Sequence, residues 1–98
     1  MAILAGDPEK TGSSFIIRFR TTRDLQVGPH WHPGDEHLTV IQGLYKLGYG
    51  EKYEAAALEE FAPGAYIHIR KTMIHFAWYG AGTIVQVNAI GPFRTFYV

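Results

Sequence analysis

The sequence HWHPGDEHLTVIQG, residues 30–43, places three histidines and two acidic residues directly before an apolar, β-type segment. Alternate side chains of a β-strand share a face, so His30 and His32 are expected to point to the same side. The proline–glycine pair that follows predicts a turn, after which Glu36 begins the next strand. Two imidazoles and a carboxylate are therefore expected to converge from one hairpin.

The rest of the chain has mostly β-type patterning. In SFIIRFRTTR, residues 14–23, Phe15, Ile17 and Phe19 alternate with polar positions, which is typical of a half-buried strand. YEAAALEE, residues 53–60, is the only helix-compatible stretch, and it is short enough to be a loop. The sequence predicts an all-β fold of seven or eight strands with little or no helix, as a small sandwich, jelly roll or barrel. The other strand-like segments are 37–50, 65–70, 74–79, 83–90 and 94–98.

Length and composition limit the classes of function. With 98 residues, the chain is expected to form a single domain over 1–98. Nine basic and nine acidic residues cancel, so no net field favours nucleic acid or an anionic membrane as a partner. No cysteine is present, which excludes thiolate–zinc sites and cysteine nucleophiles. No apolar run approaches the length of a membrane span, and a cytoplasmic location is expected.

The histidine-rich stretch admits two interpretations. A single His-x-His pair is often incidental to function, and an interaction or structural sandwich with incidental histidines would purify without metal. A further histidine on a neighbouring strand would favour a metal site, and His75 in KTMIHFAW is the candidate. Imidazole and carboxylate ligands suit one divalent transition metal (Fe, Mn, Ni, Zn, Co or Cu) better than calcium or magnesium.

The spacing around this stretch resembles the first motif of the cupin superfamily, in particular its small single-domain bacterial members. That motif contains His-x-His, three or four residues, Glu, six residues and Gly, and residues 30–43 match it from His30 to Gly43. Asp24 stands where the motif begins with glycine, so the motif spans about 24–43. We expect the turn to survive there, because aspartate tolerates a left-handed backbone.

A second cupin motif is matched over about 64–79. Gly64 and His75 are in register with the motif, whereas Arg70, Thr72 and Tyr79 replace its proline, its second glycine and its asparagine. The resemblance implies a jelly-roll β-barrel in which one metal ion is bound by four side chains. It also implies a homodimer, as is common among single-barrel cupins. The implied ligands are His30, His32, Glu36 and His75.

The other polar residues have separate expected positions in the fold. Gln86 lies in the apolar stretch TIVQVNAI, and if it faces inward it is a candidate contact for the cofactor or the substrate. His37 should face away from Glu36 and be exposed. His68 is expected on an outer face or in an interface, and Asp35 in the turn. A basic stripe on one strand is interpreted as a solvated face; it comprises Arg18, Arg20 and Arg23.

Two functions remain open from the sequence. The first is a metal-dependent enzyme that acts on a small organic molecule, by dioxygenase-type oxidation or by Lewis-acid isomerase or lyase chemistry. The second is a non-catalytic barrel that binds or senses a small ligand. A catalytic centre should keep open coordination positions and a lined pocket, whereas a vestigial one should be filled by side chains.

Overall fold

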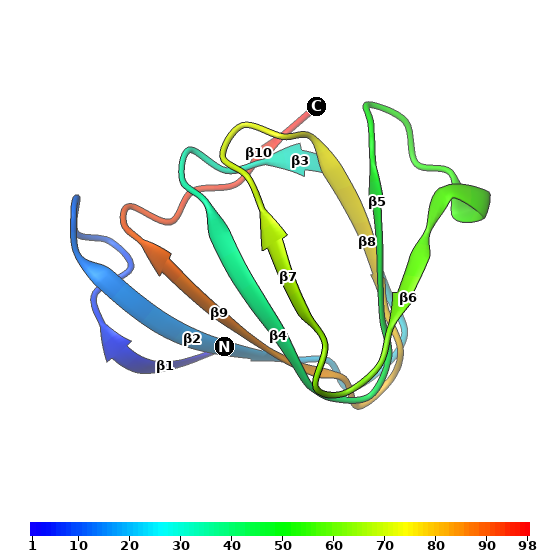
Figure 1. Cartoon of the computed structure of the whole chain (residues 1–98), viewed down its shortest axis with the longest axis horizontal. Coiled ribbons are helices and arrows are strands. Elements are labelled where there is room, and N and C mark those ends of the chain that lie inside the picture. The colour runs from blue at the N-terminus through cyan, green and yellow to red at the C-terminus, as the bar shows by residue number, and fades with distance from the viewer.

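The computed structural model describes residues 1–98, and its regular secondary structure is almost entirely β-strand (Figure 1). Its only helical element is the 3-10 turn η1 (Ala55–Ala57). The chain contains no helix that could span a membrane. The strands are β1 (Ala2–Gly6), β2 (Ser14–Arg20), β3 (Leu25–Trp31), β4 (Glu36–Gln42), β5 (Tyr45–Tyr49), β6 (Glu59–Phe61), β7 (Tyr66–Ile69), β8 (His75–Tyr79), β9 (Ile84–Ile90) and β10 (Phe96–Tyr97).

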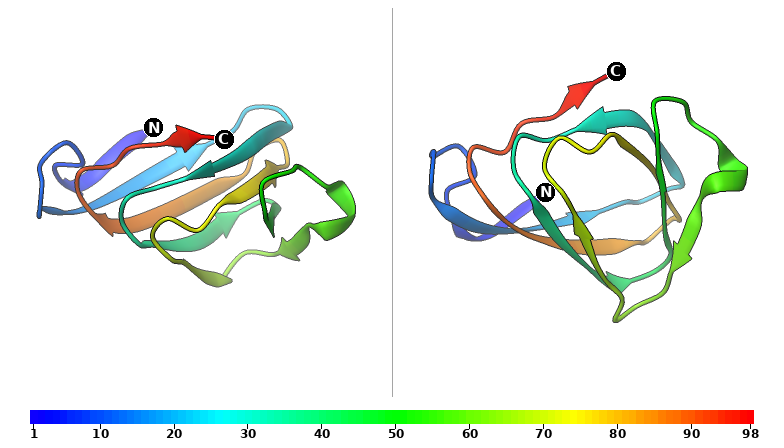
Figure 2. Two further views of the ribbon diagram at one scale, coloured as in Figure 1. Left: turned by 90° about the horizontal axis from the view of Figure 1, so that it is seen from above. Right: turned by 45° about the horizontal axis from the view of Figure 1, so that its top comes forward.

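The strands form two antiparallel sheets of five strands each. Their orders are β1-β2-β9-β4-β7 and β10-β3-β8-β5-β6. Figures 1 and 2 show the sheets facing each other and curving into a barrel around a common interior. This arrangement confirms the predicted all-β, jelly-roll architecture with little helix.

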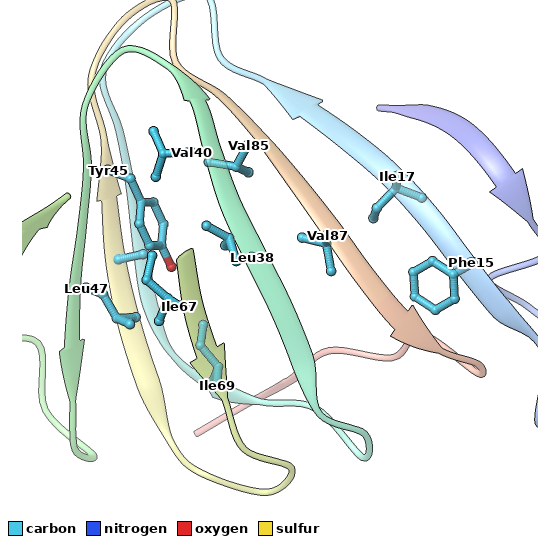
Figure 3. Packing of buried hydrophobic residues seen from close by; sticks show 11 residues of the cluster. Phe15, Ile17, Leu38, Val40, Tyr45, Leu47, Ile67, Ile69, Val85 and Val87 are labelled. Atoms are coloured by element: carbon cyan, nitrogen blue, oxygen red, sulfur yellow. The ribbon is translucent and has the colours of Figure 1, made fainter. Parts of the chain in front are cut away.

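The core fills the space between the two sheets. Along β2, Phe15 and Ile17 are buried while Arg18 and Arg20 are exposed, as the alternation in the sequence predicts. Figure 3 shows the buried side chains of β2, β4, β7 and β9 pointing toward Tyr45 and the rest of β5. The core cluster comprises Phe15, Ile17, Leu38, Val40, Tyr45, Leu47, Ile67, Ile69, Ala77, Val85 and Val87.

The structure refines the expectations for three segments. The segment 37–50 forms two strands, because Gly43 takes a left-handed conformation with φ of 86° and turns the chain into the opposite sheet. The helix-compatible stretch 53–60 contains only the single turn η1, and its end pairs with β5 as β6. The ten strands exceed the seven or eight expected, and β1, exposed at every position, carries no alternation that would reveal it.

One end of the barrel is closed by three turns that hydrogen bond to one another. We call this the closed end; it comprises Thr21, Leu44 and residues 80–83. The Thr83 hydroxyl donates to the carbonyl of Leu44 and accepts from its N–H, at 3.0 and 3.1 Å. The Thr21 hydroxyl donates to the carbonyl of Gly80 at 2.8 Å. The two buried threonines therefore tie the turns between β2 and β3, β4 and β5, and β8 and β9 together.

Two turns depart from the cupin motifs in residue type. Thr72 has a φ of 61°, the left-handed conformation for which the second motif uses glycine. Asp24 has no positive φ, so the expectation of a left-handed aspartate is wrong. Instead, the Asp24 carboxylate accepts a hydrogen bond from the N–H of Ala81 at 2.9 Å. A side-chain contact thus fixes this turn without a glycine.

Candidate metal centre

The four predicted ligand residues lie at the end of the barrel opposite the closed end. We call this region the histidine end; it comprises His30, His32, Glu36 and His75. His30 is in β3 directly opposite His75 in β8. His32 follows β3, and Glu36 begins β4 in the other sheet. All four residues are buried, so the two distant motifs meet at one point inside the barrel.

The imidazoles are close enough to share one ion. Each histidine offers one ring nitrogen, and these three nitrogens lie within 4.8 Å of one another. Nitrogens bound to one ion at about 2.1 Å lie at most about 4.2 Å apart, so a sub-ångström contraction would close the coordination shell. The Glu36 Oε1 atom lies 2.9 Å from Nε2 of His32 and 3.7 Å from Nε2 of His75.

The backbone fixes the orientation of all three rings. Nδ1 of His30 lies 2.7 Å from the carbonyl oxygen of Gly28. Nδ1 of His32 and Nδ1 of His75 lie 2.8 and 2.9 Å from the carbonyls of Arg94 and Met73. A carbonyl oxygen only accepts hydrogen bonds, so each Nδ1 carries the proton. In the neutral ring Nε2 then holds a free lone pair, as a metal ligand requires.

The surroundings of Glu36 show whether these residues fit a cation. Its side chain is 7% exposed, and Oε1 is the only buried side-chain polar atom without a hydrogen-bond donor. The nearby Nε2 of His32 carries no proton when the ring is neutral, so two lone pairs face each other across 2.9 Å. A buried carboxylate without a partner costs several kcal/mol. A divalent cation bound to Oε1 and to the imidazoles removes that cost, so the residues fit a metal ion.

Burial and the carboxylate act on the histidines in opposite directions. Burial lowers the pKa of His30, and it lowers the pKa of His75 to about 4. Burial also acts to lower the pKa of His32, but the hydrogen bond and negative charge of Glu36 outweigh it and raise that pKa. His30 and His75 are therefore neutral near pH 7 and ready to coordinate, while His32 retains a proton more readily.

A cavity of about 250 Å³ adjoins the four residues. Two of its lining residues, Met1 and Tyr97, are mostly exposed. Its walls are largely apolar and come from both sheets. Tyr45 and Tyr79 enter it from the closed end, and burial raises the pKa of both phenols, so they stay protonated. The histidine end thus opens on a lined space and is not filled by side chains.

Gln86 does not reach this cavity, and the prediction that it contacts the cofactor or substrate is wrong. In β9 the inward positions are those of Val85 and Val87, which places Gln86 on the outer face. There its Oε1 accepts a hydrogen bond from Nε of Arg18 on the neighbouring strand at 3.0 Å. Both alternating sets of side chains in TIVQVNAI contain apolar residues, so the pattern alone could not fix which set faces inward.

The remaining histidines lie outside the barrel, as expected, although His37 is half-buried and not exposed. His37 is on the outer face of β4 and stacks on the rings of Tyr66 and His68. Nε2 of the exposed His68 lies 2.9 Å from Oδ2 of Asp35. Asp35 also accepts a hydrogen bond from the N–H of Lys71 at 2.7 Å, so it joins two neighbouring loops and not only its own turn.

The sequence did not reveal the role of the C-terminal segment. Beyond supplying the carbonyl of Arg94, this segment stacks the Phe93 ring on His32, with centroids 5.1 Å apart. The N–H of Val98 donates to the carbonyl of Pro29 beside the His-x-His stretch. Backbone carbonyls leave no residue-type signal, so only the path of the chain could show this contribution.

The comparisons with known proteins concern the fold. No protein-family model matches the sequence, and no curated protein matches it. Solved structures do match. One is an uncharacterised protein with a double-stranded β-helix domain from Klebsiella pneumoniae, at 16% identity and a TM-score of 0.66. That match covers 98% of this chain and 82% of the other.

Two further matches have more specific names. An RmlC-like cupin protein from Desulfovibrio desulfuricans has 14% identity and a TM-score of 0.67, over 91% of this chain and 78% of that one. An oxalate oxidase has 17% identity and a TM-score of 0.67, over 87% of this chain and 46% of that one. At these identities the likeness shows the fold alone: the chain has the same double-stranded β-helix fold as these cupin proteins.

Proposed function

We propose that this chain binds one divalent transition metal through His30, His32, Glu36 and His75. The metal-bearing chain would act as an enzyme on a small organic molecule in the adjoining cavity. The observation that carries the proposal is the orphaned Oε1 of Glu36, which faces imidazole lone pairs in a buried site. When His32 is neutral, no group of the protein donates a proton to this oxygen, and a cation is the partner that suits all four side chains.

The donor set favours a transition metal over calcium or magnesium. Three imidazoles and one carboxylate suit iron, manganese, cobalt, nickel, copper or zinc, whereas calcium and magnesium prefer oxygen ligands. Four protein ligands leave about two positions of an octahedral shell for solvent or substrate. A bound ion of this kind supplies Lewis acidity, or electron transfer where it is redox-active.

The protein's own residues would provide binding and exclusion of water. The cavity, at about 250 Å³, is smaller than the pockets that hold drug-sized ligands. Apolar side chains from both sheets, among them Leu38, Val85 and Val87, would surround the hydrocarbon part of a substrate. Such walls lower the local dielectric constant and strengthen electrostatic interactions at the centre. The substrate is accordingly a small molecule with at least one oxygen that can reach the metal.

A second candidate function is a non-catalytic, metal-dependent binding barrel. Apart from the four proposed ligands, the only side-chain polar groups that line the cavity are the hydroxyls of Tyr45, Tyr79, Thr95 and Tyr97. None of these is a ready general base near pH 7. This shortage favours either chemistry centred on the metal or simple binding, and turnover distinguishes the two.

The experiment that tests metal binding is elemental analysis of untagged, purified protein. We expect about one transition-metal ion per chain in the wild type. Glu36→Gln should reduce retention of the metal at least about tenfold, because it removes the anionic ligand while preserving shape. Asp35→Asn is the matched control, since Asp35 neighbours Glu36 but bonds only to the outward-facing His68 and to the N–H of Lys71.

The outcomes separate the alternatives. Wild-type protein without metal, or equal losses in Glu36→Gln and Asp35→Asn, would contradict the proposed centre. If metal is present, screening for oxygen consumption and for isomerase or lyase turnover of small oxygenated molecules follows. Turnover that disappears in Glu36→Gln supports the enzyme, whereas ligand binding without turnover supports the binding barrel.

A further inference from the structure

Two tyrosines face each other across neighbouring strands at the inner end of the cavity. Tyr45 begins β5 and lies directly opposite Tyr79, which ends β8. Their rings are 5.0 Å apart in an edge-to-face arrangement, and Phe19 packs on Tyr79 from the other sheet. All three side chains line the cavity. Together they form its aromatic floor, which is attached to the closed end.

Neither phenol hydroxyl of this pair bonds to the protein. The hydroxyls that do make hydrogen bonds are those of Ser13, Thr21, Tyr66, Thr72, Thr83 and Thr95. Tyr45 is 1% exposed and is the largest fully buried side chain of the protein. Because Oε1 of Glu36 is the only fully buried side-chain polar atom without a partner, the unpaired hydroxyl of Tyr45 must retain some accessible surface, and Tyr45 lines the cavity. Figure 3 shows the Tyr45 hydroxyl turned into the barrel, toward Ile67 and away from Val40.

The tyrosines and the histidine end lie at different depths of the same cavity. On β8, His75 and Tyr79 both point inward and are four residues apart, which corresponds to roughly 13 Å along the strand. The phenol rings span part of this separation. Between the two polar groups the cavity walls are apolar and include Val27, Leu38 and Ala77.

We infer that Tyr45 and Tyr79 form a second polar subsite, whose hydroxyls donate hydrogen bonds to an oxygen of the bound ligand distant from the metal-bound oxygen. This inference rests on the proposed metal centre and specifies the ligand further. The ligand carries oxygen at both ends and a short hydrocarbon segment between them. Tyr45 and Tyr79 are thus specificity residues.

The charges of the site indicate which end is anionic. A divalent cation with one carboxylate ligand keeps a net charge of about +1, which favours a carboxylate of the ligand at the metal. The phenols are neutral donors and favour a hydroxyl or carbonyl oxygen. The substrate class is therefore a short hydroxy- or oxo-carboxylate whose second oxygen is remote from the carboxylate.

The test compares pairs of probes that differ by one hydroxyl group. Unbranched alkanoates from propanoate to hexanoate are each compared with the ω-hydroxy acid of the same length, by isothermal titration calorimetry on metal-loaded and metal-free protein. At one chain length, the wild type should prefer the hydroxy acid by roughly five- to tenfold, as a hydrogen bond in a buried site provides. Tyr45→Phe and Tyr79→Phe should reduce this preference while leaving affinity for the alkanoate unchanged.

Controls distinguish this inference from the proposed metal centre and from a structural role. Tyr53→Phe is the matched control, because Tyr53 packs on Phe76 and does not line the cavity. Elemental analysis of each variant should show unchanged metal content, so loss of metal counts against the centre and not against the subsite. Tyr45→Phe should be at least as stable as the wild type, because its hydroxyl has no protein partner.

Two results would overturn the subsite. One is the absence of any preference for a hydroxy acid at every chain length in both the loaded and the metal-free protein. The other is a preference that persists in the double variant Tyr45→Phe/Tyr79→Phe.

Discussion

The closed end and the histidine end of the barrel both bury polar side chains, but they satisfy them differently. At the closed end, Thr21 and Thr83 find their hydrogen-bond partners in neighbouring turns. At the histidine end, each imidazole has one nitrogen satisfied by the backbone, while Oε1 of Glu36 has no donor. The buried polar groups at the closed end find all their hydrogen-bond partners within the protein. Those at the histidine end need a bound ligand to satisfy Oε1 of Glu36. The comparison separates polar residues that build the fold from those that serve function.

The largest expected difference between the two ends is their response to metal removal. With the ion at about a thousand times its dissociation constant, binding stabilises the folded state by about 4 kcal/mol. For a domain of this size that corresponds to roughly 20 °C in Tm. We expect a chelator to lower the Tm of the wild type by this order in differential scanning fluorimetry. Glu36→Gln should respond far less, and identical melting with and without chelator in the wild type would contradict the comparison.

The closed end can be broken without touching the metal. Thr83→Val removes the hydroxyl that bonds to both backbone groups of Leu44, and it leaves the buried N–H of Leu44 unpaired. We expect a loss of about 2 kcal/mol in the free energy of unfolding, measured by urea denaturation. Thr39→Val, on the outer face of β4, is the control and should change stability by less than about 0.5 kcal/mol. Reduced metal content in folded Thr83→Val would show that the two ends are not independent.

Low pH should weaken metal binding at the histidine end. The hydrogen bond and charge of Glu36 raise the pKa of His32, so metal binding must increasingly displace its proton as the pH falls. The apparent metal affinity should therefore fall about tenfold per pH unit below the pKa of His32. The fall should steepen as His30 and then His75, with a pKa of about 4, become protonated. Competition with a chromophoric chelator across pH measures this, and an affinity that is constant between about pH 7 and pH 5 would refute it.

The smallest expected effect concerns the turn before β8, which links the histidine end to the barrel. Thr72 adopts a left-handed conformation that costs a non-glycine residue about 1–2 kcal/mol. Thr72→Gly relieves this cost, but glycine loses more backbone entropy on folding. We expect a net gain below about 1 kcal/mol by urea denaturation. Thr72→Ala keeps the strained conformation and should show no gain; a gain in alanine equal to that in glycine would exclude backbone strain as the cause.

The sequence predicted the histidine end better than any other part of the fold. The spacings His30-x-His32, Glu36 and His75 placed four residues that the structure brings together. Such spacings are informative because a strand and a tight turn have fixed geometry. The alternation in β2 also predicted the buried face of that strand correctly, since its outer positions include two arginines.

Where the prediction was wrong, long-range pairing decided the outcome. Gln86 faces outward because β9 lies between β2 and β4, whose inward residues fix its register. The alanine-rich stretch before β6 favours a helix locally, but pairing with β5 overrides that preference. The sequence also did not predict the aromatic floor. By residue type alone, Tyr45 and Tyr79 cannot be distinguished from ordinary core residues, and only the structure shows that their hydroxyls are unpaired.

The three backbone carbonyls behind the histidines have an evolutionary consequence. Every amino acid presents a carbonyl, so residues 28, 73 and 94 are free to change type without altering which way the imidazoles point. Substitutions at these positions would then preserve the orientation of the imidazole rings, as long as the backbone keeps its conformation. Homologues should accordingly tolerate wide variation at these three positions, while substitution of the imidazoles themselves should be rare.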